Sequence, residues 1–208
     1  RKESSAASDV YKRQRQAVVT RGQTLTDSIR QQFRGLSEIG KQIDGDIEAT
    51  VRQVNDISSQ IAAVNGEIVR SRAMGDNPND LMDRRDLLVE KLANLINVTV
   101  DRKDPDEFMV HTDGQVIVQG SLARQIKSVP QIDNNGYGKL VWTDTGIDAQ
   151  FHGGTLGALI ELRDKDIRSE VQSLNTMALN FADLVNDVHR NAVGKNNVTG
   201  LDFFVQHD

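Results

Sequence analysis

A chain of 208 residues with 38 % hydrophobic and only 4 % aromatic residues has room for one or two domains, and its low aromatic content favours long helices that meet along narrow apolar stripes. The formal net charge of -5 gives no positive footprint for a phosphate backbone, so no nucleic-acid partner is expected. The lack of cysteine excludes disulfides and cysteine-ligated metals, and no apolar run reaches the ~18 to 20 residues of a membrane span, so no membrane partner is expected either.

The first fourteen residues, RKESSAASDVYKRQ, are Ser-rich and basic and show no apolar period. We expect residues 1–14 to be an artefact or a disordered tail outside the fold. No apolar region of a signal peptide follows them, so an exported protein would leave the cell without a visible cleaved signal.

A long helix is predicted from about residue 16 to residue 73. Apolar side chains recur every three or four residues between Leu25 and Ile68, a spacing that only a helix places on one face. The stripe is narrow, so its natural partner is another helix in a coiled-coil-like pair. Gly75 and Pro78 should end this helix, because proline cannot continue the hydrogen-bond ladder.

A second helix is predicted over about residues 80–96. We expect Asn79 or Asp80 to cap its first N–H groups, and Asp80 and Asp83 to face the positive end of its dipole. Leu88 and Leu92 lie on its apolar stripe. Because the connection is short, this helix should fold back antiparallel to the first.

After Asn97 the apolar period changes from 3.6 to two, which is typical of strands. Asp113-Gly114 has the sequence of a type I′ turn and should join strands over 107–112 and 115–120 into a hairpin. A weaker strand is predicted at 139–142. Residues 97–151 are therefore expected to form a small, mostly antiparallel β insert.

Gly153-Gly154-Thr155 should introduce a third long helix, whose stripe runs from Leu156 to Val188 and which should end near Val193-Gly194. The predicted fold class is mainly α with a small β insert (α+β), an elongated antiparallel bundle or coiled coil of three helices. Residues 152–208, the third helix and C-terminal tail, should pack with residues 15–96 as one rod-like domain.

The charged stretch that begins the second helix could be read as an acid/base or metal site. However, Asp80 and Asp83 form only an i,i+3 pair, and the neighbouring arginines would repel a cation. We therefore interpret Asp80, Asp83 and Asp86 as structural.

Two arginines occupy positions on apolar stripes. Arg85 lies on the second helix between Leu81 and Leu88, Arg163 lies on the third, and an aspartate follows each of them, Asp86 and Asp164. Such an arginine can lay its stem along the core and present its planar fork to a carboxylate or carbonyl on the facing helix. We predict that both arginines make polar contacts that fix the register between helices.

Motifs of catalysis are not found in the sequence. The four histidines, His111, His152, His189 and His207, have no second ligand at HExxH spacing, and neither a Walker motif nor G-x-G-x-x-G is present. We predict a protein that is not an enzyme and has no catalytic, cofactor-binding or metal residues, hence no cofactor.

Four segments occur together and in order: PNDLMDRRDLLVEKLANLINVTV (78–100), DGQVIVQGSLARQ (113–125), GGTLGALIELRDKDI (153–167) and GLDFF (200–204). In this the chain resembles the central part of the flagellar hook-associated protein 1 family, the first hook–filament junction proteins. The resemblance covers about residues 20–204. It implies a structural subunit of the bacterial flagellum that forms the junction between hook and filament.

The same resemblance implies self-association into a ring in the full-length protein, contacts with the hook protein and with the second junction protein or flagellin, and an export chaperone. It implies an extracellular location in the flagellum after secretion by the flagellar export apparatus, and it leaves a periplasmic flagellum open. The family's terminal helices are not visible, so this chain alone is expected to be monomeric or weakly associating. The alternative function is a helical coiled-coil interaction or adaptor module, which would not need a β insert.

Overall fold

The computed structural model describes residues 2–101, 108–134, 136–193 and 198–205. The chain divides into two compact units, the first made of Arg1–Ile39 with Ile167–Asp208 and the second of Gly40–Asp166. The boundaries expected near residues 96 and 151 both fall inside the second unit, which contains the β insert together with the helices on either side of it. The packing of residues 15–96 and 152–208 into one rod-like domain stays a prediction.

The first helix, α1, spans Lys2–Ala73. It begins well before the predicted start near residue 16, and the Ala, Lys, Arg and Gln content of its first turns is compatible with helix. The reading of residues 1–14 as an artefact stays a prediction. The stripe is buried only from Ile43 onward, as at Ile47 and Ile61, whereas Phe33 and Ile39 are 43 % and 48 % exposed.

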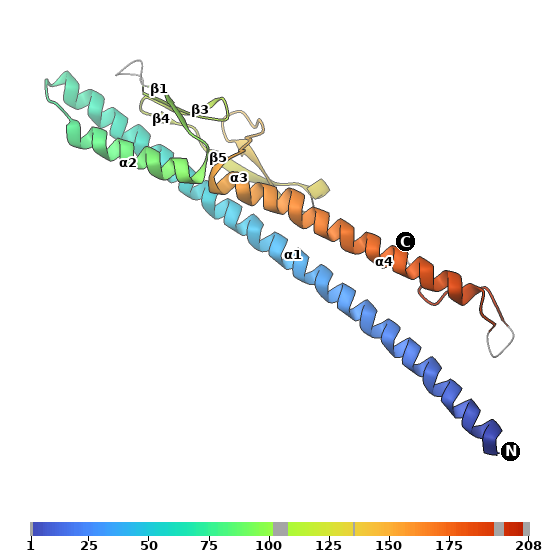
Figure 1. Ribbon diagram of the computed structural model, residues 1–208. Helices are drawn as coiled ribbons and strands as arrows, with labels where there is room; N and C mark the ends of the chain where they lie inside the picture. Colours follow the sequence, from blue (N-terminus) through green and yellow to red (C-terminus); the bar gives the residue numbers. More distant parts are fainter. Residues whose placement is uncertain (1, 102–107, 135, 194–197, 206–208) are drawn as a thin grey trace. The chain divides into compact units, whose positions relative to one another are not determined.

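The second helix, α2, spans Asn79–Leu95 and runs back beside the C-terminal part of α1, as Figure 1 shows. Gly75 adopts φ 88°, a conformation that glycine reaches without steric cost, and so turns the chain. The expected cap is wrong, because Pro78 occupies the N-cap position and no side chain caps the helix there. The Pro78 carbonyl accepts from the Met82 N–H at 3.1 Å, so the helix begins one residue earlier than predicted, at Asn79.

The β insert consists of two antiparallel sheets, and the hairpin prediction is confirmed. Asp113 and Gly114 have φ of 45° and 80°, the two positive values of a type I′ turn. The predicted first residue of this hairpin, Glu107, lies outside the described residues. The sheets have the orders β1-β2-β3-β4 and β5-β6, with bounds β1 Thr99–Asp101, β2 Met109–Thr112, β3 Gln115–Gln119, β4 Leu122–Ala123, β5 Ile126–Pro130 and β6 Gly138–Trp142.

The third helical segment is not one continuous α-helix. It consists of α3 (Gly154–Glu161), a π-helical stretch η2 (Leu162–Ile167) and α4 (Arg168–Arg190). The α-helix thus ends before the predicted position, and Gly194, its expected C-cap, lies outside the described residues. The π-helix is not predicted by the sequence, because one wider turn leaves the spacing of apolar residues almost unchanged.

The fold class is confirmed as mainly α with a small antiparallel β insert. The core of the second unit joins α1 and α2 to both sheets and to α3, with fully buried side chains that include Ile47, Leu92, Ile117, Trp142 and Leu156. A short helix, η1 (Ile132–Asn134), lies between β5 and β6. Among the residues that the structure describes, no helix is long and apolar enough to span a membrane.

Candidate functional site

Arg163 lies at the centre of a polar cluster in the second unit. Its side chain is only 4 % exposed, and its Nε and Nη2 atoms donate to the two carboxylate oxygens of Asp164, each at 2.8 Å. Its Nη1 atom donates to Asp44 Oδ1 on α1 and, at 3.0 Å, to the backbone oxygen of Gly138 at the start of β6. One guanidinium group therefore joins α1, β6 and the π-helix.

The charge of Arg163 is held by its partners. Burial opposes this charge, but hydrogen bonds and attraction from Asp164 and Asp44 outweigh burial and raise the pKa of the guanidinium. The π-helical turn carries both Arg163 and Asp164. Asn134 Nδ2 donates to Asp164 Oδ1 at 3.2 Å, so the second carboxylate is also tied to the loop between β5 and β6.

Gly138 leaves room for this cluster. Its N–H donates to Asp44 Oδ1 at 3.1 Å while its carbonyl accepts from Arg163. A Cβ atom at this position would overlap the Ser128 hydroxyl on the neighbouring strand β5. With glycine at position 138, the Ser128 hydroxyl keeps its place beside β6 while β6 contacts α1.

Arg85 is the second buried arginine and is 6 % exposed. Its Nη1 atom donates to Asn65 Oδ1 on α1 at 3.4 Å, and its guanidinium lies 3.9 Å from the centroid of the Phe108 ring. The Asp86 carboxylate is 3.8 Å from its Nε. Asn65 in turn donates from Nδ2 to the Gly120 carbonyl at 2.9 Å. Arg85 thus connects α2, α1 and the β insert.

A row of three polar residues on α1 holds the β insert at separate points. Asp44 binds Gly138, Asn65 binds Gly120, and Asn55 accepts from the N–H of Ile126 at 2.9 Å and donates to its carbonyl at 2.8 Å. These positions are 11 and 10 residues apart, about three turns each, so they follow one face of the helix. We call Asp44, Asn55 and Asn65 the polar row.

The other predicted structural residues have more ordinary positions. Asn79, Asp80 and Asp83 are exposed at the beginning of α2, and Leu88 and Leu92 are buried on its inner face. In the charged stretch at the beginning of α2, Asp80 and Asp83 therefore face solvent, whereas Arg85 faces the core. Arg85 and Arg163, which both occupy apolar stripes in the sequence, are both buried and both donate a hydrogen bond to α1. Their role in fixing the register between helices stays a prediction.

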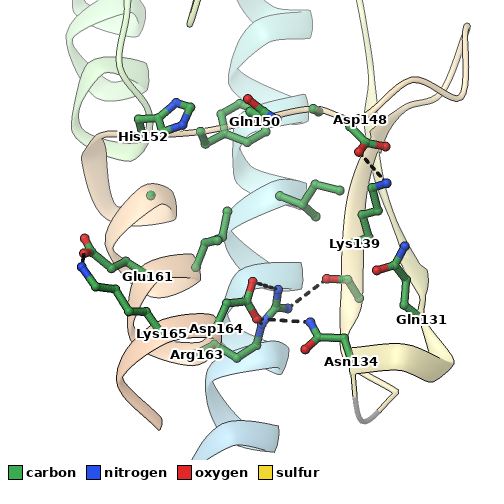
Figure 2. A pocket seen from close by; sticks show the side chains of 16 residues that line it. Gln131, Asn134, Lys139, Asp148, Gln150, His152, Glu161, Arg163, Asp164 and Lys165 are labelled. Carbon is green, nitrogen blue, oxygen red and sulfur yellow. Dashed lines mark hydrogen bonds and ion pairs between the residues drawn. The ribbon is translucent and has the colours of Figure 1, made fainter. Parts of the chain in front are cut away.

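A recess of about 590 Å³ lies beside Arg163, between β6 and α3, and Figure 2 shows the side chains around it. Leu140, Phe151 and Ile160 give it an apolar part. The charged groups at its rim are paired: Lys139 Nζ is 2.5 Å from Asp148 Oδ2, and Lys165 Nζ is 2.8 Å from Glu161 Oε1. The hydrogen bond from Lys165 lowers the pKa of Glu161. The rim charges are thus engaged with one another.

The described residues hold no cluster of three or more histidine or acidic side chains suited to a metal ion. His152 is mostly exposed, and its backbone N–H donates to Asp113 Oδ2 at 3.0 Å. His189 Nδ1 lies 2.7 Å from the Leu201 carbonyl oxygen, and because a carbonyl can only accept, Nδ1 is the donor. His207 lies outside the described residues. The arrangement is suited to holding elements together.

Sequence reasoning missed the polar row and Gly138. Asn and Asp on a long helix look like ordinary solvated residues, and nothing in their spacing names a partner 55 to 94 residues away along the chain. One sequence feature could have indicated the polar row. Asn55 and Asn65, which are poor helix formers, each directly follow a residue of the apolar stripe of α1.

Comparison with known proteins gives consistent matches. The family model described as flagellar hook-associated protein FlgK helical domain matches residues 4–204. Flagellar hook-associated protein 1 of Salmonella typhimurium is 30 % identical over 199 residues, covering 91 % of this chain and 36 % of that protein. The Bacillus subtilis protein of the same name is 27 % identical over 219 residues, covering 91 % of this chain and 43 % of that protein.

Among solved structures, the flagellar hook junction protein FlgK from Burkholderia pseudomallei superposes with a TM-score of 0.77 at 27 % sequence identity. The match covers 86 % of this chain and 34 % of that protein. The chain therefore spans between about one third and two fifths of the length of the relatives that it matches.

Proposed function

The chain belongs to the flagellar hook-associated protein FlgK helical domain family, and we propose that it is a structural part of the junction between hook and filament in a bacterial flagellum. The observation that carries this proposal is the family match over residues 4–204, which includes both buried arginines and the whole β insert. The relatives are named flagellar hook-associated protein 1, and the similar solved structure is that of a flagellar hook junction protein.

The proposed role is mechanical and not enzymatic. Its support lies in how the chain uses its charged residues: Arg163 and Arg85 are buried and engaged with α1, and the charges around the recess beside Arg163 are paired. Buried charges that interact with several secondary-structure elements hold those elements in one arrangement. A domain that passes force between hook and filament needs such connections.

We further propose contacts with other flagellar subunits, namely self-association into a ring, the hook protein, and the second junction protein or flagellin. Surface for such contacts exists on α4, where large apolar side chains are between 41 % and 69 % exposed. Exposed apolar side chains close together on one element are typical of protein interfaces. They are Met177, Leu179, Phe181, Leu184 and Val188.

The proposed location is the flagellum outside the cell, reached through the flagellar export apparatus without a cleaved signal and with the help of an export chaperone. The alternative of a helical adaptor module does not account for the β insert, which three residues of α1 hold in place. A periplasmic flagellum would use the same contacts.

A domain exchange tests the proposal. Residues 15–204 would replace the matching helical domain of Salmonella typhimurium hook-associated protein 1, and swimming in soft agar and attached filaments would be measured. We expect filaments to stay attached and motility to be regained. A matched chimera with Leu88→Ala and Leu92→Ala should fail, because its core is broken. A first chimera that is stable and secreted but sheds filament protein would contradict the proposal.

A further inference from the structure

The segment after α4 turns back and binds the helices of the first unit. Gly200 has φ 79°, and its N–H donates to the Arg190 carbonyl at 3.0 Å. The Asp202 carboxylate lies 2.5 Å from Arg190 Nε, and His189 Nδ1 lies 2.7 Å from the Leu201 carbonyl. The last turn of α4 therefore contacts three consecutive residues of the returning chain.

Asn186 recognises the backbone of this segment. Its Oδ1 atom accepts from the N–H groups of Phe203 and Phe204 at 2.9 Å and 2.8 Å, and its Nδ2 atom donates to the Phe204 carbonyl at 2.9 Å. The side chain is 2 % exposed, although Asn is rarely so buried unless its amide is satisfied. Both polar side-chain atoms of Asn186 are thus used to hold a segment 17 to 18 residues away.

Gly22 on α1 receives the aromatic side chains. A Cβ atom at Gly22 would lie 2.7 Å from Phe203 Cε1 and 3.6 Å from Phe204 Cζ, so only glycine allows the rings to approach this closely. The Phe203 and Phe204 rings meet edge to face at 4.9 Å between centroids, and Phe204 meets Phe181 of α4 in the same way at 6.0 Å. The rings therefore contact both helices.

We propose that Gly22 and Asn186 form a selective peptide-docking site between α1 and α4 within the first unit, and that Leu201–Phe204 is its built-in ligand, a latch that ties α4 to α1. The ligand class is a short, bent segment with two consecutive aromatic residues after a carboxylate. Asn186 binds the backbone, Gly22 admits the first ring, and Arg190 binds the carboxylate. When the latch is released, the two helices lose a connection that does not depend on the core of the second unit.

Hydrogen exchange of the Phe203 and Phe204 amides in the full chain tests this site. Gly22→Leu places a good helix former on α1 and fills the space of the Phe203 ring, and Asn186→Leu removes the acceptor of both amides. We expect either change to accelerate exchange of these two amides by about 10-fold or more, while the amides of α4 exchange as in the parent.

The matched controls are Gly35→Leu, where a Cβ meets nothing within 4 Å, and Asn175→Leu on the exposed face of α4. Both should leave the Phe203 and Phe204 amides unchanged. If Asn186→Leu fails to fold, the test rests on comparing the exchange rates of the Phe203 and Phe204 amides in Gly22→Leu and Gly35→Leu. The proposal is overturned if the two amides exchange in the parent as fast as in an unstructured peptide, or if Gly22→Leu and Gly35→Leu behave alike.

Discussion

At the scale of single residues, Arg163 shows why a charge can lie within an apolar seam. Its guanidinium donates to two carboxylates and one carbonyl, so few of its N–H groups depend on water. Removing one member of such a group leaves the others buried without a partner, which costs more than the pair itself contributes. Arg163 is therefore expected to matter more for stability than the surface pairs around it.

Replacing Arg163 by leucine should lower the free energy of unfolding by about 2–4 kcal/mol, because the partly buried Asp44 and Asp164 carboxylates lose their cation. Urea unfolding measures this. Lys165→Ala is the control, since it breaks an exposed pair with Glu161 and should leave the urea midpoint close to that of the parent. Equal midpoints for the two variants would show that the cluster does not stabilise the fold.

The latch should respond to acid through Asp202. The hydrogen bond from Arg190 lowers the pKa of this carboxyl below its ordinary value of 3.8. The docked state therefore binds protons less readily than the released one, so docking is favoured above this value and weakens as pH falls through the lowered pKa. The contact between the Phe203 ring and Gly22, followed by NMR as the pH is lowered from about 6 to well below 3.8, should fade. In Asp202→Asn that pH dependence should be absent, and a parent without it would contradict the role of this ion pair.

The sequence predicts which arginines are buried but not what they bind. Arg85 and Arg163 occupy positions at which the helical repeat of apolar residues would place an apolar side chain. Asp44 lies 119 residues before Arg163, and no local spacing relates the two. Gly138 is likewise invisible as a partner, because its importance comes from the pairing of β5 with β6 and from their contact with α1.

At the scale of elements, α2 depends on its inner leucines. Leu92 is 0 % exposed, and Leu92→Ala should cost about 2–5 kcal/mol through lost burial and the cavity that remains. Leu87 on the same helix is 51 % exposed, so Leu87→Ala should cost less than about 1 kcal/mol. Thermal and urea unfolding compare the two, and similar losses would mean that α2 is not held by this face.

The entry of α3 depends on a glycine pressed against the end of α2. Gly154 has φ 66°, and a Cβ there would lie 2.5 to 2.6 Å from backbone atoms of Leu95 and Ile96. Gly146 has a similar φ of 70° but open space around it. Gly146→Ala should therefore cost only the ~1 to 2 kcal/mol of its left-handed conformation, and Gly154→Ala at least about 1 kcal/mol more. Equal costs would mean that the two helices can move apart freely.

The elements differ in how well their sequence predicts them. The long helix, the type I′ hairpin and the return of α2 follow from period, from Asp113-Gly114 and from Pro78, all of which are local signals. The π-helix at Leu162–Ile167 does not, because it arises where Arg163 and Asp164 turn toward α1 and the β5–β6 loop. The cap of α2 was missed because proline took the place of a polar side chain.

At the level of the whole molecule, the two units differ in how much of their apolar surface is buried. The second unit holds nearly all the buried apolar residues of the described chain, whereas the first leaves Val18, Phe33 and much of α4 exposed. Exposed apolar side chains on helices are suited to contacts with other protein surfaces. We therefore expect the second unit to supply most of the stability and the first to supply contacts in an assembly.

Immunogold labelling tests whether the domain lies at the junction between hook and filament. Flagella from cells that carry the domain-exchange chimera would be labelled with gold-conjugated antibodies against this chain and viewed by electron microscopy. We expect label confined to the boundary between hook and filament. Label spread along the filament or confined to the cell body, in cells where the chimera is stable and secreted, would contradict it.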